Sequence, residues 1–338
     1  MNVLENYPLK KLNTFGINVK SKYLVEVNST EEILEIIESE KFKNFKKLVL
    51  GGGSNVLFTK DYNGLIILNK IKGKKVTYQD ADSVKLLVGA GENWHELVMY
   101  TVEKGWGGIE NLSLIPGNTG TAPMQNIGAY GVEIKDTFVE LEALEISTGK
   151  IEKFNKEKCK FAYRESIFKN EKKNQYIILN ITLELNKNPK LSVNYGEIKN
   201  DLKNKNIHFP TIKDVSEAII SIRKRKLPDP KKIGNSGSFF KNPVVNFNKL
   251  KKLKEKYPNI VNYPINKNEF KIAAGWMIEK AGWKGKTINN YGVHKNQSLV
   301  LVNYGDAKGI EIYNLSKKII VDIEEKFGIS LVREVNII

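Results

Sequence analysis

Three consecutive glycines directly after a short apolar segment constrain most strongly how this chain can fold. Residues 47–50 have the length and composition of a buried strand, and residues 51–55 continue as Gly-Gly-Gly-Ser-Asn. Glycine lets backbone N–H groups approach a ligand closely, so a loop of this kind at a strand end can hold a phosphate. It is not a Rossmann fingerprint, because that spacing would require a glycine where Val56 stands. The sequence therefore predicts an α/β unit that carries a glycine loop.

A second glycine-rich region lies between residues 107 and 131. Within it, residues 115–121 and 125–131 offer further backbone donors and small hydroxyls. One loop of this composition would be equally typical of a structural turn. Two such loops near the ends of α/β units favour a dinucleotide ligand whose pyrophosphate is held by main-chain N–H groups rather than by lysine.

Hydrophobic periodicity predicts strands and helices that alternate along most of the chain. Capping residues mark two helix starts, Ser29 with Glu32 and Asn93 with Glu96. In the last expected strand the apolar side chains alternate, which places Glu334 on the opposite face. The expected strands cover residues 22–27, 47–50, 65–68, 84–88, 138–146, 176–185, 191–193, 298–302 and 329–338. The expected helices cover residues 30–37, 94–104, 215–225, 273–280 and 306–327.

Length and charge describe a globular protein with a basic surface. A chain of 338 residues has room for two or three domains. The 54 Lys+Arg against 38 Asp+Glu give a formal charge of +16, which raises nucleic acid as a partner. We do not expect one, because the basic residues are mostly scattered lysines without an RNA-binding signature; they would favour a small polyanionic substrate instead. With the single cysteine Cys159 and no run of about 18 apolar residues, we expect a cytoplasmic protein without a membrane span.

Residues 234–243, Gly-Asn-Ser-Gly-Ser-Phe-Phe-Lys-Asn-Pro, have the composition of an active-site loop. The glycines allow close approach to a ligand, the two aromatic residues can exclude water, and Ser238 remains as a donor. A hydrolase nucleophile elbow is excluded, because neither Ser236 nor Ser238 has a glycine two residues later. The alternative is an ordinary turn between elements.

Arginine is rare in this chain and therefore informative. The four arginines are Arg164, Arg223, Arg225 and Arg333, and arginine more often than lysine marks a planar or bidentate contact. Arg164 lies among aromatic and aliphatic residues, which fits either a guanidinium aimed at an anionic substrate group or a surface ion pair with Glu165. For the basic run 223–226 a structural role is the default, because the helix dipole favours cations at a helix C-terminus.

Two other kinds of site are not supported. Residues 285–287, Gly-Lys-Thr, look like the end of a Walker A loop, but the first glycine of that motif would fall at Lys280. The three histidines are far apart, and none has a second ligand at metal-binding spacing. We therefore expect neither a P-loop nor a metal site.

Taken in order along the chain, these segments closely resemble the UDP-N-acetylenolpyruvoylglucosamine reductase family, flavoenzymes of bacterial peptidoglycan precursor synthesis. The likeness covers nearly the whole chain, from residues 13–17 to the end. Residues 119–124 depart most from the family pattern, which leaves individual flavin contacts there open. The most specific stretches are residues 112–117, 125–131, 163–168 and 237–243.

The resemblance implies a mixed α+β and α/β fold, in which a two-lobe flavin domain of the FAD-binding type-2 (PCMH-like) class is joined to a C-terminal α+β substrate-binding domain. Residues 1–70 would form the first FAD-binding lobe, to which a final strand at residues 329–338 returns. Residues 71–222 would form the second lobe, and residues 223–328 the substrate-binding domain.

The resemblance also implies non-covalent FAD, with NADPH as reductant. A hydride would pass from NADPH to the flavin and from flavin N5 to the vinyl carbon of UDP-N-acetylglucosamine enolpyruvate, giving UDP-N-acetylmuramate. The residues that match cofactor-binding positions are Gly51, Gly52, Gly53, Ser54, Asn55, Pro116, Gly117, Asn118, Thr119, Gly120, Asn126, Gly128, Ala129 and Tyr130.

The resemblance assigns the remaining roles to residues scattered over the chain. Ser238 matches the proton donor, and Arg164 and Glu334 match the other two catalytic positions. The implied enzyme is a monomer. Substrate contacts are matched by Tyr195, the mobile substrate-covering tyrosine of one form of the family, and by Lys226, Asn242 and Gln297.

Two alternatives stay open on the sequence. One is another FAD-dependent oxidase or dehydrogenase on the same scaffold. The other is a basic nucleic-acid-binding protein without enzymatic activity, which salt-dependent binding of RNA or DNA and the absence of flavin would indicate.

Overall fold

The structure is a computed structural model that describes residues 2–338. It separates into two compact units, each assembled from segments distant in sequence. The first unit comprises Met1–Tyr7, Ser21–Gly52 and Asn63–Arg225. The second unit comprises Pro8–Lys20, Gly53–Tyr62 and Lys226–Ile338. The division into three lobes remains a prediction.

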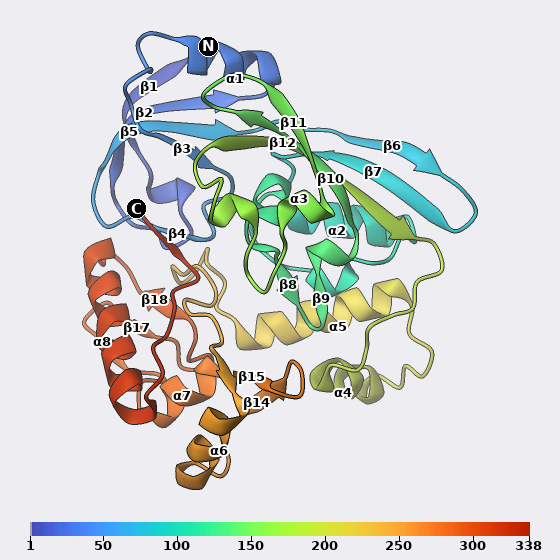
Figure 1. Ribbon diagram of the computed structural model, residues 1–338, viewed down its shortest axis with the longest axis vertical. Helices are drawn as coiled ribbons and strands as arrows, with labels where there is room; N and C mark the ends of the chain where they lie inside the picture. The colour runs from blue at the N-terminus through green and yellow to red at the C-terminus, as the bar shows by residue number, and fades with distance from the viewer. Residues whose placement is uncertain (1) are drawn as a thin grey trace. The chain divides into compact units, whose positions relative to one another are not determined.

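Strands and helices alternate over much of the chain (Figure 1). The strands are β1 (Val3–Pro8), β2 (Lys20–Val27), β3 (Lys47–Leu50), β4 (Val56–Leu57), β5 (Tyr62–Asn69), β6 (Lys74–Gln79), β7 (Ser83–Gly89), β8 (Gly128–Ala129), β9 (Val132–Glu133), β10 (Phe138–Glu145), β11 (Ile151–Asn155), β12 (Tyr176–Asn186), β13 (Val244–Asn246), β14 (Asn262–Pro264), β15 (Glu269–Ile272), β16 (Thr287–Ile288), β17 (Tyr291–Val293), β18 (Leu301–Asn303) and β19 (Asn336–Ile337). The α-helices are α1 (Thr30–Glu38), α2 (Trp94–Glu103), α3 (Lys156–Cys159), α4 (Gly196–Asn204), α5 (Ile212–Lys226), α6 (Phe247–Lys256), α7 (Ala274–Lys280) and α8 (Gly309–Phe327). Short 3₁₀ helices lie at Lys10–Leu12, Glu110–Leu112, Thr119–Thr121, Pro123–Gln125, Ile134–Asp136 and Ile167–Lys169.

The first unit contains two larger sheets. One has the strand order β1-β2-β5-β3, with β3 and β5 parallel, and the other has the antiparallel order β11-β10-β12-β7-β6. Leu144 and Ile177 of the second sheet belong to the same buried cluster as Val25 and Leu65 of the first. The two sheets therefore share a core, and the first glycine loop begins where β3 leaves it.

The predicted helix starts of the first unit are confirmed. The side-chain oxygen of Ser29 accepts a hydrogen bond from the Glu32 N–H at the start of α1, and Asn93 accepts one from the Glu96 N–H at the start of α2. Such caps satisfy backbone donors that the first helical turn leaves without partners. These local interactions explain why both boundaries could be predicted.

The second unit is built from short sheets around α8. Antiparallel strands have the orders β13-β15-β14 and β16-β17-β18, and β19 pairs in parallel with β4. The buried face of α8 carries Ile312, Leu315, Ile319 and Ile323, and the helix packs beside β17, β18 and α7 (Figure 1). The chain end thus pairs with β4, and the return of residues 329–338 to a first FAD-binding lobe stays a prediction.

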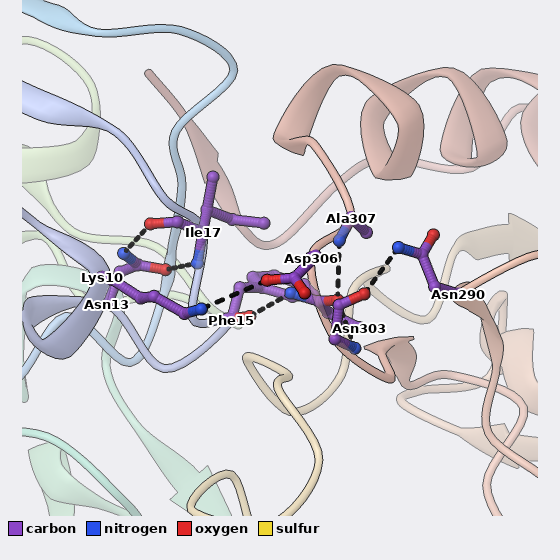
Figure 2. Close-up of polar contacts among 9 residues, drawn as sticks. Lys10, Asn13, Phe15, Ile17, Asn290, Asn303, Asp306 and Ala307 are labelled. Atoms are coloured by element: carbon purple, nitrogen blue, oxygen red, sulfur yellow. Dashed lines mark hydrogen bonds and ion pairs between the residues drawn. The ribbon is translucent and has the colours of Figure 1, made fainter.

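Buried asparagines fasten the segment Pro8–Lys20 into the second unit (Figure 2). The Asn13 side chain accepts a hydrogen bond from the Ile17 N–H and donates to the Ile17 carbonyl. The Asn303 amide donates to the Phe15 carbonyl over 2.8 Å, and its side-chain oxygen accepts from the Ala307 N–H. Because each of these side-chain groups has a partner, the network holds its backbone segments without an unsatisfied buried amide.

Two strand predictions are wrong in part or in whole. Residues 191–193 have no strand structure; Leu191 and Val193 instead pack against the buried cluster of α4 and α5. Residues 329–338 form a strand only at β19, although Arg333 makes a single bridge to Phe240. In both places the alternating apolar residues make core contacts without forming a continuous ladder of strand hydrogen bonds. Periodicity alone does not distinguish such a segment from a strand.

Further features of the secondary structure depart from expectation. The strand expected at residues 298–302 is displaced to β18, and the sequence analysis did not predict α4, α6 or the hairpin of β16 and β17. Among residues 2–338, no helix is long and apolar enough to cross a membrane.

We predict that Gly309→Ala destabilises the protein by about 1–3 kcal/mol, because a Cβ there would lie 1.7 Å from the Phe58 carbonyl oxygen. The matched control is Gly275→Ala in α7, where the nearest atom, in Leu299, would lie 3.4 Å away. That control should be neutral or gain up to roughly 1 kcal/mol from helix propensity. Thermal unfolding of both variants measures the difference, and equal melting temperatures would contradict the prediction.

Candidate active site

The predicted site residues divide between the two units. Arg164, Tyr195 and the second glycine region belong to the first unit, whereas Ser238 and Glu334 belong to the second. The first glycine loop runs from one unit into the other, with Gly51 and Gly52 in the first and the residues from Gly53 onward in the second.

In the first unit, the two glycine loops lie against each other. A Cβ on Gly52 would lie 2.9 Å from the Gly117 Cα and 3.1 Å from the Asn118 side-chain oxygen. A Cβ on Gly51 would lie 2.7 Å from the Thr121 methyl group. Beside the backbone of Gly117 there is no room for a side chain, so glycine is needed at position 52, whereas the Thr121 side chain next to Gly51 can rotate away.

The second loop is held in place by the turn after β7. The Thr119 N–H donates to the Glu92 carbonyl over 2.8 Å, and the Gly120 N–H donates to the Ala90 carbonyl over 2.9 Å. A Cβ on Gly120 would lie 2.5 Å from the Ala90 Cβ. The N–H groups of Thr119 and Gly120 therefore shape the loop, and a bound phosphate would have to use other donors.

Arg164 stands at the tip of a tight hairpin. Ala162 and Glu165 exchange backbone hydrogen bonds of 3.2 and 3.1 Å, and Arg164 between them has φ +56. Its guanidinium donates to the Gly128 carbonyl over 2.5 Å. Positive φ in a residue other than glycine carries strain that is common at functional sites. The geometry thus anchors Arg164 to the second glycine region, which favours the functional interpretation over a surface ion pair.

Asn126 connects that hairpin to the glycine region. Its side-chain amide donates to the Ala162 carbonyl over 3.0 Å and to the Glu133 carboxylate over 2.9 Å, while its oxygen accepts from the Lys135 N–H. Asn126 was predicted to bind the cofactor. In the structure its side chain is hydrogen-bonded to protein partners and positions the Arg164 hairpin, and contact of Asn126 with the cofactor stays a prediction.

Arg223 is a site candidate that the sequence analysis missed. Its guanidinium is hydrogen-bonded to the Tyr130 hydroxyl, and its Nε is shielded from solvent and has no hydrogen-bond partner among residues 2–338. Burial lowers the pKa of Arg223, and burial raises the pKa of Tyr130. The Tyr195 ring, half exposed at the start of α4, makes an edge contact of 5.7 Å with Tyr130. A shielded donor beside the second glycine region suits an anionic ligand.

A helical pattern could have identified Arg223. It lies four residues after Ile219, and therefore on the buried face of α5, whereas Lys224 and Arg225 are exposed. The interpretation of residues 223–226 as one helix-end run concealed this difference. A basic residue in register with the apolar face of a helix is the signal that separates Arg223 from its neighbours.

In the second unit, Ser238 and Glu334 lie on adjacent backbone segments. Ser238 bridges Val300, and the Glu334 N–H donates to the carbonyl of Phe239 over 2.8 Å. The same pairing continues with the Lys241 N–H and the Val332 carbonyl. The serine and the glutamate, far apart in the sequence, are thus fixed in one register.

The two aromatic residues after Ser238 serve the core. Phe239 is 0% exposed and Phe240 1%, and their rings make an edge contact of 5.3 Å. Phe239 also contacts Phe15. Their burial fixes the segment that carries Ser238, so the expectation that they wall off a ligand is replaced by an anchoring role.

A glycine turn sets the approach to Ser238. Gly237 has φ +67, and its N–H donates to the Asn235 side-chain oxygen over 2.9 Å. The Asn235 amide in turn donates to the carbonyls of Pro228 and Ile233. An L-residue other than glycine would be strained at this φ, so the turn depends on Gly237.

The end of the first glycine loop joins the same region of the second unit. Gly53 has φ +62, and a Cβ there would lie 1.9 Å from the Leu12 carbonyl oxygen. The Asn55 amide donates to the Glu334 carbonyl over 3.3 Å, and the Asn55 carbonyl accepts from the Asn336 N–H. The predicted cofactor loop and the predicted catalytic glutamate are therefore directly linked.

Two predicted substrate contacts also flank the Ser238 segment. The Asn242 side-chain oxygen accepts from the Ala274 N–H at the start of α7. The Gln297 carbonyl accepts from the N–H of Val300, which bridges Ser238. Lys226 is the last residue of α5.

The single cysteine, Cys159, is buried. Burial raises the pKa of the Cys159 thiol to about 12, so it stays protonated at neutral pH. In the described part of the chain, no three His, Cys, Asp or Glu side chains group as metal ligands.

Comparison with known proteins gives matches over both halves of the sequence. A family model described as FAD binding domain matches residues 21–155, and one described as UDP-N-acetylenolpyruvoylglucosamine reductase, C-terminal domain, matches residues 229–338. Proteins named UDP-N-acetylenolpyruvoylglucosamine reductase from Flavobacterium johnsoniae and Amoebophilus asiaticus are each 50% identical to this chain, and each alignment covers 100% of both sequences.

A solved structure shares the fold. The crystal structure of UDP-N-acetylenolpyruvylglucosamine reductase from Thermus caldophilus matches with a TM-score of 0.69 at 20% identity, covering 99% of this chain and 98% of the other. The predicted fold class, a FAD-binding domain followed by a C-terminal domain of mixed α and β structure, is confirmed.

We predict that Gly52→Ala loses flavin while it keeps the fold, because the new methyl group would collide with the backbone of Gly117. Gly51→Ala is the matched control: its collision is with the end of the Thr121 side chain, which can rotate. The ratio of flavin to protein absorbance, with circular dichroism for the fold, measures both. Wild-type flavin content in Gly52→Ala would show that the close contact between the two glycine loops is not needed for flavin binding.

Proposed function

Because the chain belongs to the UDP-N-acetylenolpyruvoylglucosamine reductase family, we propose that it reduces UDP-N-acetylglucosamine enolpyruvate to UDP-N-acetylmuramate through Ser238, Arg164 and Glu334. It is an FAD-dependent oxidoreductase with NADPH as the reductant. The observation that carries the residue assignment is the pairing of the Ser238 segment with the segment of Glu334.

The residues present fit FAD. The paired loops of the first unit form a cradle that side chains would fill, and Arg223 supplies a buried donor without a protein partner at Nε. Gly51–Asn55, the region from Pro116 to Tyr130 and Arg223 would hold the cofactor. The first loop has neither histidine nor cysteine, and the protonated thiol of Cys159 is not a nucleophile, which supports non-covalent binding.

FAD, when bound, would supply hydride transfer from NADPH to the vinyl carbon of the substrate. Electron density then builds on the adjacent carbon and on the carboxylate conjugated with it. Arg164 balances that charge, because a guanidinium offers a carboxylate two parallel donors. The backbone of Arg164 is fixed by its hairpin, so little reorganisation is needed during the reaction.

Ser238 supplies the proton that completes the reduction. A serine hydroxyl is a poor acid in water, so this role requires a strongly basic carbon in a site shielded from solvent. The buried aromatic residues that follow Ser238 fix its backbone. Glu334, in register beside it, can accept a hydrogen bond from the reacting group and orient it.

The remaining assignments complete the proposal. Tyr195, Lys226, Asn242 and Gln297 bind the substrate, and the edge contact of Tyr195 with Tyr130 supports a covering role for the α4 side. The enzyme works as a cytoplasmic monomer. Its three lobes follow the boundaries at residues 70 and 222, with the last strand returning to the first lobe.

We predict that Arg164→Lys keeps the fold and the flavin but lowers turnover by about tenfold or more, equivalent to roughly 1.4 kcal/mol of transition-state stabilisation. A lysine retains the charge but cannot offer two planar donors. Arg225→Lys is the matched control, since the Arg225 guanidinium lies 3.6 Å from the Glu197 carboxylate and 3.9 Å from the Asp201 carboxylate, and a lysine can also form such long ion pairs. Steady-state assays test both, and normal turnover of Arg164→Lys would remove Arg164 from the site.

We predict that Ser238→Ala separates the two half-reactions. Flavin reduction by NADPH should stay near normal, because it needs no proton from Ser238. Reoxidation by the enolpyruvyl sugar nucleotide should slow by about 10²–10⁴-fold, as expected for loss of a positioned general acid. Rapid-mixing absorbance measures each step.

Ser238→Cys and Ser236→Ala serve as comparisons. The thiol can still donate a proton, so Ser238→Cys should retain more activity than Ser238→Ala. Ser236, with contacts no shorter than 3.4 Å from its hydroxyl, should be replaceable by alanine. Equal slowing of both half-reactions in Ser238→Ala would mean that the serine shapes the pocket, and normal reoxidation would eliminate it as the acid.

A further inference from the structure

Arg333 makes two specific contacts with α8 in the second unit. Its Nε donates to the Ser316 hydroxyl over 2.8 Å, and its guanidinium carbon lies 4.7 Å from the centre of the Tyr313 ring. Ser316 is fully buried, and its hydroxyl donates to the Tyr313 carbonyl over 2.6 Å. The hydroxyl therefore accepts from Arg333 and donates to the helix, which fixes the direction of both hydrogen bonds.

The backbone around Arg333 is paired with the segment that follows Ser238. Arg333 bridges Phe240, and the N–H of the next residue, Glu334, donates to the Phe239 carbonyl. Leu331 and Val335, two positions away on either side, are 3% and 4% exposed. Successive residues of extended backbone point to opposite faces, so at the bridge with Phe240 the Glu334 side chain leaves the segment on the side opposite to the Arg333 contacts with α8.

We propose that Arg333 is a positioning residue, which fixes Glu334 by locking the terminal segment onto α8. The inference rests on the proposed role of Glu334. The Arg333 guanidinium is held at its Nε edge by Ser316 and over one face by the Tyr313 ring. These contacts resist rotation of the terminal segment about its own axis. The backbone hydrogen bonds to the Ser238 segment alone do not prevent that rotation. Burial lowers the pKa of Arg333.

The alternative is that Arg333 binds an anionic part of the substrate directly. Its Nε is occupied by Ser316 and its face by Tyr313, so this role would require the guanidinium to leave α8. The two roles predict different kinetics. Direct binding would raise the substrate KM, whereas positioning would slow the reoxidation step at saturating substrate.

The test compares Arg333→Met and Ser316→Ala with Lys317→Met. Lys317 also lies over the Tyr313 ring, at 4.6 Å, so its replacement removes a cation from the same ring without releasing the terminal segment. We expect Arg333→Met to slow flavin reoxidation by the enolpyruvyl sugar nucleotide by roughly ten- to a hundredfold, the effect of a small misplacement at a reacting centre. Ser316→Ala should slow it less, and flavin reduction by NADPH should stay unchanged in all three.

Two further readouts distinguish positioning from general stability. In a Glu334→Gln background, Arg333→Met should cause little additional slowing, because the group that it positions is already changed. Hydrogen exchange of the backbone amides at residues 332–336 should accelerate in Arg333→Met and not in Lys317→Met. If Arg333→Met does not fold, Ser316→Ala provides the same comparison.

Failure of the inference and failure of the proposed function give different results. Normal reoxidation in Glu334→Gln would overturn the role of Glu334 and the inference with it. Slow reoxidation in Glu334→Gln with normal reoxidation in Arg333→Met and Ser316→Ala would overturn the inference alone. Equal slowing by Arg333→Met in the presence and absence of the Glu334 carboxylate, or a rise in KM alone, would also overturn it.

Discussion

The hydrogen bond from the Glu334 N–H to the Phe239 carbonyl joins the end of the chain to the segment of Ser238. It is one bond of a short antiparallel pairing, and the burial of Phe239 and Phe240 keeps that pairing in the core. The Asn55 side-chain amide donates to the Glu334 carbonyl and so joins the first glycine loop to the same pairing. Three segments that are distant in the sequence therefore share one backbone framework. A reaction that needs a proton and a carboxylate in fixed positions benefits from such a framework, because main-chain geometry varies less than side-chain rotamers.

A second constraint acts in the first unit, where loops meet without side chains. Gly52 approaches the backbone of Gly117 so closely that a methyl group cannot fit. The backbone N–H groups of Thr119 and Gly120 are hydrogen-bonded to the turn after β7, and the Asn126 amide is hydrogen-bonded to the Arg164 hairpin. The loops are thus organised before any ligand arrives. Pre-organisation of this kind lowers the entropy lost on binding, since the protein has already ordered its share of the contacts.

Sequence reasoning succeeded where the cause is local and failed where it is tertiary. The caps at Ser29 and Asn93 act within one helical turn, and both helix starts were predicted correctly. The glycine loops and the family resemblance identified the cofactor-binding class. Residues 191–193 were wrongly predicted as a strand, because their apolar side chains pack on helices rather than on a sheet. Arg223 was missed because its burial depends on the register of α5 against the second glycine region. The link between Ser238 and Glu334 depends on pairing between distant segments, which no local pattern reveals.

The few arginines of this chain differ from its many lysines in supplying a defined contact geometry as well as charge. Most of the 54 basic residues are lysines, and many of them contribute charge to an exposed surface. Arg164, Arg223 and Arg333 each direct a guanidinium to a specific oxygen, whereas Arg225 makes long, exposed ion pairs. Lysine could supply the charge at all four positions. Lysine could not supply a planar group whose donors and faces are used together. Arg164, Arg223 and Arg333 lie at the positions where a planar guanidinium makes such contacts.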